Sequence, residues 1–106
     1  MTDAKRFLES LIGRELQTVT GRPNRVLRLE GDQVVVATTR SPRGQPVSTA
    51  WIQGALDELE ANGEIEISVA SVGHRSAFVG AVLRELPGAH IVNGPSPTRI
   101  RLVRAG

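Results

Sequence analysis

Cationic and hydrogen-bonding side chains are the residues of this sequence that could do chemistry, and they fall into three groups. The groups are Arg40, Ser41, Arg43 and Gln45; His74, Arg75, Ser76 and Arg84; and Arg99 with Arg101. An arginine guanidinium binds phosphate oxygens or a guanine edge through two parallel hydrogen bonds, and hydroxyl, amide and imidazole groups contact phosphates and bases alike. The three groups therefore predict contacts to double-stranded DNA.

The charges are distributed unevenly along the chain, whose formal net charge is +2. Five of the eleven acidic residues lie between Asp57 and Glu66, and the rest of the sequence holds the other six together with all thirteen basic residues. Proteins that bind polyanions often keep their acids away from the binding face. Twelve of the basic residues are arginine, a bias that GC-rich codon usage would also produce. The charge distribution alone leaves both interpretations open.

Other function classes lack their signatures. The chain has no cysteine, and His74 and His90 have no carboxylate at ligand spacing, so we expect no metal and no cofactor. Nucleophile-elbow, Walker, dinucleotide-binding and zinc-protease motifs are absent from the sequence, so we do not expect an enzyme. No apolar run approaches the roughly 20 residues that cross a bilayer, and Met1–Arg6 lacks the apolar stretch of a signal peptide. We expect a cytoplasmic protein without membrane contact.

The first half of the chain predicts a helix followed by a hairpin. Apolar residues recur every three or four positions and predict a helix from about Asp3 to Val19. Two β-rich runs, Arg25–Leu29 and Gln33–Thr38, flank a turn that contains glycine and predict a hairpin with Leu27 and Leu29 on one face. The proline-containing segment Thr39–Pro46 predicts a loop.

The second half predicts two helices, a short strand and a second hairpin. A helix begins at Ser48 or Thr49 and reaches about Glu60, and Glu64–Ser68 alternates as a strand. Val69–Gly73 predicts one irregular or short helical turn. The last helix runs from about Arg75 to Leu86, and the final hairpin pairs Ala89–Val92 with Arg99–Val103.

The order of these elements favours an α+β fold of the winged-helix type in a single domain, residues 1–106. From Ser48 onward the order is helix, strand, turn, helix and hairpin, which is the helix-strand-helix-hairpin order of a winged helix, and the N-terminal helix and first hairpin are additions. In such folds the last helix enters the major groove and the hairpin touches the backbone. The alternative is a compact α+β sheet with helices on one face.

Each arginine group also has a purely structural interpretation. On the last helix Arg75, Ser76, Gly80 and Arg84 are expected to face outward with Ala77 and Ala81 beside them, a profile suited to a groove; the same small residues would equally permit close packing of two helices. The Thr39–Pro46 loop could be an ordinary solvated connection. Arg99 and Arg101 could protect an edge strand instead of holding a DNA backbone, and Arg25 and Arg28 have the weakest claim.

Three segments carry a resemblance to a known class of module. They are Arg40-Ser-Pro-Arg-Gly-Gln-Pro-Val47, Trp51-Ile-Gln53 and Gly73-His-Arg-Ser-Ala-Phe-Val-Gly-Ala-Val-Leu83. Over about Arg22 to Pro87 the chain resembles small DNA-reading domains found alone or beside HNH-type (McrA-like) modification-dependent restriction nucleases and helicases of bacteria. The resemblance implies methylated DNA recognition, with 5-methylcytosine as the modified base. The sequence has no HNH cluster and no helicase motif, so we expect neither cutting nor unwinding.

Two residues are candidates for contact with a modified base. Ala77 offers an apolar contact for a methyl group in the major groove, and Trp51 could stack on a flipped base or could be a core anchor. We therefore expect a non-catalytic DNA-binding module that reads 5-methylcytosine. The alternative is a protein-interaction or dimerisation winged helix, in which Ala77, Gly80 and Ala81 bury against another copy or a nuclease or helicase partner; an accessory subunit of a toxin or repressor system is a third interpretation.

Overall fold

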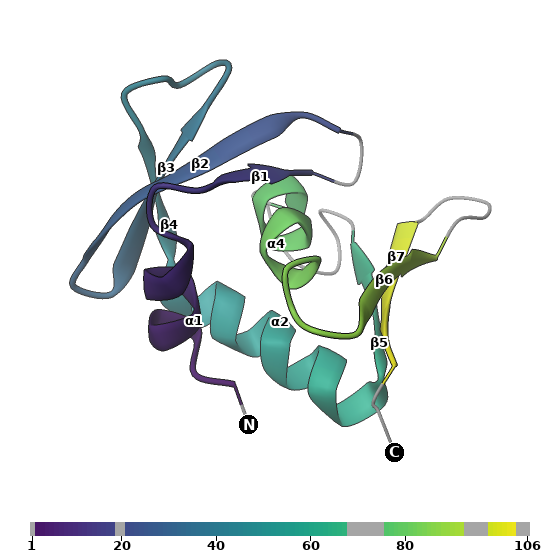
Figure 1. Ribbon diagram of the computed structural model, residues 1–106. Helices are drawn as coiled ribbons and strands as arrows, with labels where there is room; N and C mark the ends of the chain where they lie inside the picture. The colour runs from purple at the N-terminus through teal and green to yellow at the C-terminus, as the bar shows by residue number, and fades with distance from the viewer. Residues whose placement is uncertain (1, 19–20, 68–75, 93–97, 104–106) are drawn as a thin grey trace.

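The computed structural model describes residues 2–18, 21–67, 76–92 and 98–103, and in these ranges it shows helices combined with two antiparallel sheets (Figure 1). The elements in chain order are α1 (Ala4–Leu11), β1 (Glu15–Gln17), β2 (Pro23–Glu30), β3 (Gln33–Thr38), β4 (Gln45–Ser48), α2 (Thr49–Asn62), β5 (Glu64–Ile67), α4 (Ser76–Leu83), β6 (Ala89–Val92) and β7 (Thr98–Leu102). The expected α+β class is confirmed. The expected turn at Val69–Gly73 lies outside the described residues.

The first helix is much shorter than its apolar spacing predicts. The side chain of Asp3 caps α1 by accepting hydrogen bonds from the amides of Lys5 and Arg6. The helix ends at Leu11, and Gly13 follows with φ +83°, a left-handed conformation that suits glycine. Leu16 then enters strand β1 and is fully buried there. The spacing of Leu16 suits the inward face of a longer helix, but this residue is buried as part of a strand. The prediction of a helix to Val19 was therefore wrong.

Sheet A is a four-stranded antiparallel meander with the order β1-β2-β3-β4. The predicted hairpin of β2 and β3 is confirmed, but a bulge between Val26 and Arg28 shifts its register. Leu29 therefore pairs with Val34 and packs against the core, whereas Leu27 lies with Val35 next to Gly44. The expectation that Leu27 and Leu29 share a face was wrong, because a bulge reverses the alternation of side chains.

The predicted loop at 39–46 is shorter by two residues. Gln45 and Pro46 belong to strand β4, which pairs with β3 through Val36↔Gln45 and Val35↔Pro46. Because β4 is the last strand of sheet A, the missing N–H of Pro46 costs no pairing on its outer side. The segment that leaves the sheet is therefore 39–44, which we call the β3–β4 loop.

Helix α2 begins at Thr49, as its sequence predicts, and ends at Asn62, two residues beyond the expected end at about Glu60. The Ser48 hydroxyl accepts a hydrogen bond from the Ala50 amide, and Gly63 closes the helix in a left-handed conformation at φ +76°. The inward residues Ile52, Leu56 and Leu59 are completely buried. The strand that follows, β5, joins sheet B in the order β5-β7-β6, which confirms the final hairpin of β6 and β7.

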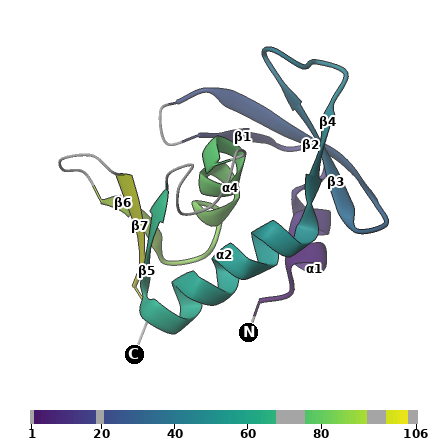
Figure 2. The same cartoon turned by 180° about the vertical axis from the view of Figure 1, so that it is seen from behind.

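Helix α4 lies between the two sheets, with α2 beneath it (Figures 1 and 2). It contacts α2, β5 and β1, and every residue from Phe78 to Leu83 is buried. The expected outward face was therefore wrong: Gly80 and Ala81 lie in the core, and only Ala77 of the three small residues is exposed. A helix with apolar neighbours on both sides has no free stripe to place in a groove. None of the helices in the described ranges is long and apolar enough to cross a membrane.

Substituting alanine at two glycines tests this fold, because the two changes should shift the free energy of unfolding in opposite directions. Gly44 has φ +103°, and a Cβ placed there would lie 2.5 Å from Cγ1 of Val35. We expect Gly44→Ala to lower the free energy of unfolding by about 1–3 kcal/mol, because both the backbone conformation and the packing resist a side chain. Gly54 lies on the exposed face of α2 with open space around it, so Gly54→Ala should raise the same quantity by about 0.5–1 kcal/mol. Urea denaturation measures both, and equal effects of the two variants would contradict the packing of the β3–β4 loop on sheet A.

Candidate nucleic-acid interface

A cleft of about 280 Å³ opens where the end of sheet A meets the first turn of α4. Its walls are Asn24, Val36, Thr38, Arg40, Gln45, Val47, Ala77 and Phe78. A hollow of about 160 Å³ adjoins it and shares Asn24, Thr38, Arg40 and Ala77. We call the first of these spaces the Asn24 cleft. It combines apolar walls with a few polar groups, which is the usual composition of a ligand site.

The register of sheet A places these side chains together. Asn24 pairs with Leu16 on one side and with Thr38 on the other. Alternation along β2 turns Asn24 and Val26 to the same inward face. Asn24 is therefore the inward position nearest the start of β2, where the apolar core gives way to the cleft.

Asn24 is an unusual residue for that position. Its exposed fraction is 6%, and within the described part of the chain its side-chain amide has no hydrogen bond. Every completely buried side-chain nitrogen or oxygen in these ranges has a hydrogen-bond partner. The amide of Asn24 must therefore be open to the cleft, where its donor and acceptor positions are unfilled.

The β3–β4 loop is held in place by hydrogen bonds around Ser41. Its amide donates to Oγ1 of Thr38 at 3.0 Å, its hydroxyl accepts from Nε2 of Gln45, and its carbonyl accepts from the Gly44 amide at 3.0 Å. Ser41 and Gln45 thus fix the loop that carries the two arginines. Arg40 lines the cleft, and Arg43 is exposed on the loop.

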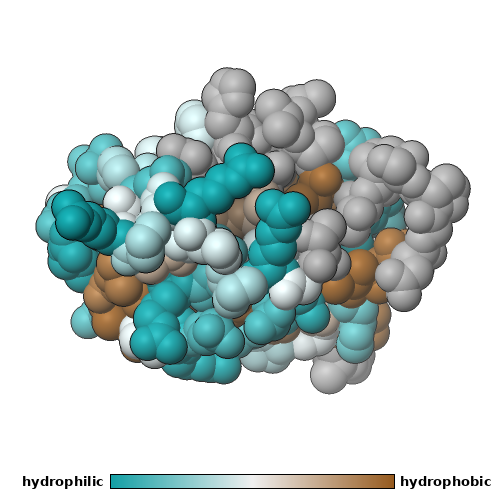
Figure 3. Space-filling view, turned by 90° about the horizontal axis from the view of Figure 1, so that it is seen from above, coloured by the Kyte–Doolittle hydropathy of each residue, from teal (hydrophilic) through white to brown (hydrophobic). Residues whose placement is uncertain are grey.

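Four arginines gather at this end of sheet A: Arg22, Arg25, Arg40 and Arg43. Arg22 and Arg40 line the adjoining hollow, and Arg25 lines a shallow depression that shares Asn24, Thr38 and Thr39 with it. Among the residues that the structure describes, none of the four guanidinium groups forms an ion pair. Glu15 also borders the depression and lies opposite Arg25 in the ladder. We call these four residues the arginine end. In the view from above, most of the coloured surface of the molecule is hydrophilic (Figure 3).

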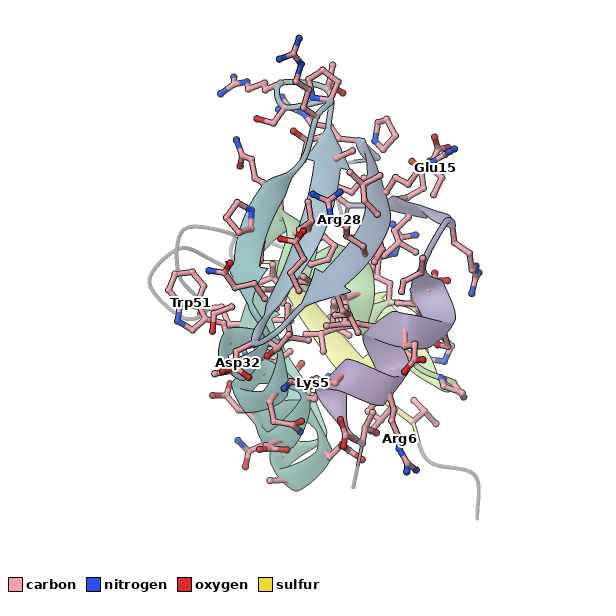
Figure 4. The ribbon with its side chains drawn as sticks, turned by 90° about the vertical axis from the view of Figure 1, so that its left-hand side faces the viewer. Lys5, Arg6, Glu15, Arg28, Asp32 and Trp51 are labelled. Atoms are coloured by element: carbon pink, nitrogen blue, oxygen red, sulfur yellow. The ribbon has the colours of Figure 1, made fainter. Side chains whose placement is uncertain are left out.

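Cations elsewhere in the described ranges are largely matched by carboxylates. Arg14 binds Glu85 at 2.8 Å, and Arg28 binds Glu30 at 2.7 Å. At the β2–β3 turn, the opposite end of β3 from the β3–β4 loop, Lys5 donates a hydrogen bond to Asp32 at 2.9 Å (Figure 4). This hydrogen bond, together with the positive charge, holds the pKa of Asp32 below its usual range.

The arginines of the final hairpin also have a protein partner. Arg99 and Arg101 flank Glu64 of β5, at 3.5 Å and 3.3 Å from its carboxylate oxygens. Figure 1 shows sheet B on the other side of α4 from sheet A. The structure therefore does not bring this pair to the arginine end, and their contact with a DNA backbone stays a prediction.

The group around the last helix is only partly described. His74 and Arg75 lie outside the described residues, and Ser76 is the first residue of α4. Nη1 of Arg84 donates hydrogen bonds to the carbonyls of Gln17 and Thr18 at 2.9 Å and 2.8 Å. Arg84 thus ties the end of α4 to the end of β1. Ala77, by contrast, is exposed and borders both the cleft and the hollow.

Trp51 is neither in the core nor at the cleft. Its exposed fraction is 46%, and it projects outward from the first turn of α2 (Figure 4). The interpretation of Trp51 as a core anchor was wrong. The two candidates for contact with a modified base, Trp51 and Ala77, do not line the same space.

Three residues of this region, Asn24, Thr38 and Arg22, are not among the predicted site residues. A usable signal was present for one of them, because the alternation of β2 places a polar side chain at Asn24 where an apolar one is expected. The pairing of Thr38 with Asn24 depends on a register that a bulge alters. Within the described ranges, no three His, Asp or Glu side chains form a group that could hold a metal ion.

A comparison of the chain with protein-family models, curated protein sequences and solved structures finds no match.

The contacts of Arg84 give a prediction that separates a structural role from a DNA-binding one. Arg84→Ala should lower the free energy of unfolding by about 1–2 kcal/mol, because two carbonyl groups lose a charged donor. Arg43→Ala removes an exposed arginine and should change it by less than about 0.5 kcal/mol. Thermal or urea unfolding compares the two variants with the wild type. An Arg84→Ala protein as stable as Arg43→Ala would show that the tie to β1 contributes nothing.

Proposed function

We propose that this chain is a cytoplasmic DNA-binding module that performs no catalysis and binds DNA at the arginine end of sheet A. The observation that carries the proposal is the grouping of Arg22, Arg25, Arg40 and Arg43 at one end of sheet A, where Arg40 lines the Asn24 cleft. None of the four forms an ion pair among the described residues. Unmatched guanidinium groups repel one another, and a phosphate backbone supplies the missing charge. Association then releases counterions from the DNA.

The distribution of acids supports the same face. Asp57 and Glu58 lie in the second half of α2, and Glu64 and Glu66 lie on β5 of sheet B, away from the β3–β4 loop of sheet A (Figure 1). An approaching duplex would therefore meet the cationic end first, because its negative phosphates are attracted by the arginines there and repelled by the carboxylates elsewhere.

The finer fold that we propose is winged-helix-like. Its support is the order α2, β5, α4, β6, β7 together with the sheet order β5-β7-β6, in which the final hairpin adds to a strand that precedes the last helix. On this proposal the hairpin is the wing. Because the middle of α4 is buried, the segments that face the DNA groove on this proposal are the first turn of α4 and the β3–β4 loop.

Selectivity for 5-methylcytosine is the second part of the proposal. The resemblance to modules of modification-dependent restriction systems suggests it, and Ala77 with Val36 and Val47 supports it by giving the cleft apolar walls. A methyl group gains free energy from such walls, while unmodified cytosine leaves the space to water. One extra methyl group in an apolar pocket contributes about 1–3 kcal/mol, so the expected discrimination is on the order of tenfold or more.

The arginine end predicts a strong salt dependence of DNA binding. Each phosphate neutralised contributes a slope of about −0.9 to the logarithm of the association constant against the logarithm of salt concentration. Arg40→Ala should lower affinity and reduce that slope by about 0.9, whereas Arg6→Ala, on the opposite side of the molecule (Figure 4), removes the same charge and should change neither. Fluorescence anisotropy with a duplex of about 20 base pairs measures both quantities. A protein that binds no duplex at low salt, or loses equal affinity in both variants, would contradict the proposal.

A matched pair of duplexes tests the methyl selectivity. One carries 5-methylcytosine and the other cytosine at the same positions, and we expect the methylated duplex to bind about tenfold more tightly. Ala77→Ser should reduce the ratio while leaving affinity for the unmethylated duplex unchanged. Equal affinities would remove the selectivity and leave general DNA binding in place. Light scattering on the same samples tests the alternative, since a dimer indifferent to DNA would favour the protein-interaction module.

A further inference from the structure

We propose that the Asn24 cleft receives one nucleobase turned out of the duplex, and that the Asn24 amide reads the hydrogen-bonding edge of that base. The inference rests on the proposed DNA-binding function and names the part of the ligand that enters the protein. It also replaces Trp51, which lies outside the cleft, as the residue that contacts an extruded base.

The side-chain amide of Asn24 is nearly buried but lacks a hydrogen-bond partner among the described residues. A polar side chain that is only 6% exposed normally forms hydrogen bonds within the protein. The Asn24 amide has none in the described part of the chain, although it borders the cleft, its adjoining hollow and the shallow depression. A group that has given up most of its water without gaining a protein partner is best matched by a ligand with a donor and an acceptor side by side.

The residues that line the Asn24 cleft match the chemistry of a nucleobase. A carboxamide offers N–H and C=O in one plane, which matches the paired donor and acceptor positions on the edge of a nucleobase. Val36 and Val47 of sheet A line one part of the cleft, and Phe78 with Ala77 of α4 line another. Apolar and aromatic walls beside a few hydrogen-bonding groups are what an extruded base requires.

Two arginines border the Asn24 cleft or its adjoining hollow. Arg40 borders both the cleft and the adjoining hollow, and Arg22 borders the hollow. A base that leaves the stack brings its own phosphates to the mouth of its pocket. Guanidinium groups at that mouth would hold those phosphates and fix the nucleotide in the extruded state.

The experiment uses duplexes that differ in the cost of extrusion. A single 2-aminopurine is placed opposite thymine in one duplex and opposite cytosine in the other, where it is mispaired and leaves the stack more readily. We expect the wild-type protein to bind the mispaired duplex about tenfold more tightly and to raise 2-aminopurine fluorescence on binding. Asn24→Ala should lose most of this preference while keeping its affinity for the paired duplex and its salt slope.

Two further variants keep the result interpretable. Asn24→Leu fills the cleft with an apolar side chain and should abolish the fluorescence rise; its thermal unfolding, with that of Asn24→Ala, shows whether the fold is intact. Because the amide has no protein partner, neither variant should unfold the protein. Arg40→Ala should weaken binding to both duplexes, and to the mispaired duplex at least as much as to the paired one, whereas Arg6→Ala should weaken neither.

The outcomes separate this inference from the proposed function. Salt-dependent binding without mispair preference or fluorescence change would overturn the inference and leave DNA binding intact. An Asn24→Ala protein that keeps the full preference would overturn the role of Asn24. Absence of duplex binding at low salt would overturn both proposals. Tight binding of a free nucleoside monophosphate by a protein that ignores the duplex would also overturn them, and would make the cleft a small-ligand site.

Discussion

The burial of α4 between two antiparallel sheets is the constraint on which the rest of this structure depends. The helix contacts β1 of sheet A, β5 of sheet B and α2, so its apolar residues from Phe78 to Leu83 all lie in the core. It covers part of the inner face of each sheet, beside α1, which contacts β2, and α2, which contacts β4, β5 and β7. Gly80 and Ala81 are buried in this packing, which agrees with the structural interpretation of small residues in a helix. The same burial removes the middle of α4 from any interface.

The consequence is that the exposed functional groups lie at the ends of elements. The first turn of α4 contributes Ala77, β2 contributes Asn24, and the β3–β4 loop contributes Arg40. Three segments distant in the sequence thus border one cleft. Ladder register and the hydrogen bonds of Ser41 hold the cleft in shape, so a ligand would meet a site that is largely formed in advance.

The same structure divides the arginines into two kinds. Arg14, Arg28, Arg99 and Arg101 bind carboxylates, and Arg84 binds backbone carbonyls. Such pairs on the surface contribute little to stability but occupy the guanidinium groups. The arginines at the end of sheet A have no such partner within the described residues. Position in the fold, and not abundance in the sequence, distinguishes the two kinds.

The sequence by itself determined the elements whose signals are local. The start of α2 at Ser48 or Thr49 and the α+β class required no knowledge of distant residues. Only the tertiary structure decided that Leu16 lies in a strand, that α4 is buried on both sides, and that Asn24 borders a cleft. Apolar spacing specifies that a residue is buried but not which neighbour buries it, and register across a bulge depends on both strands at once.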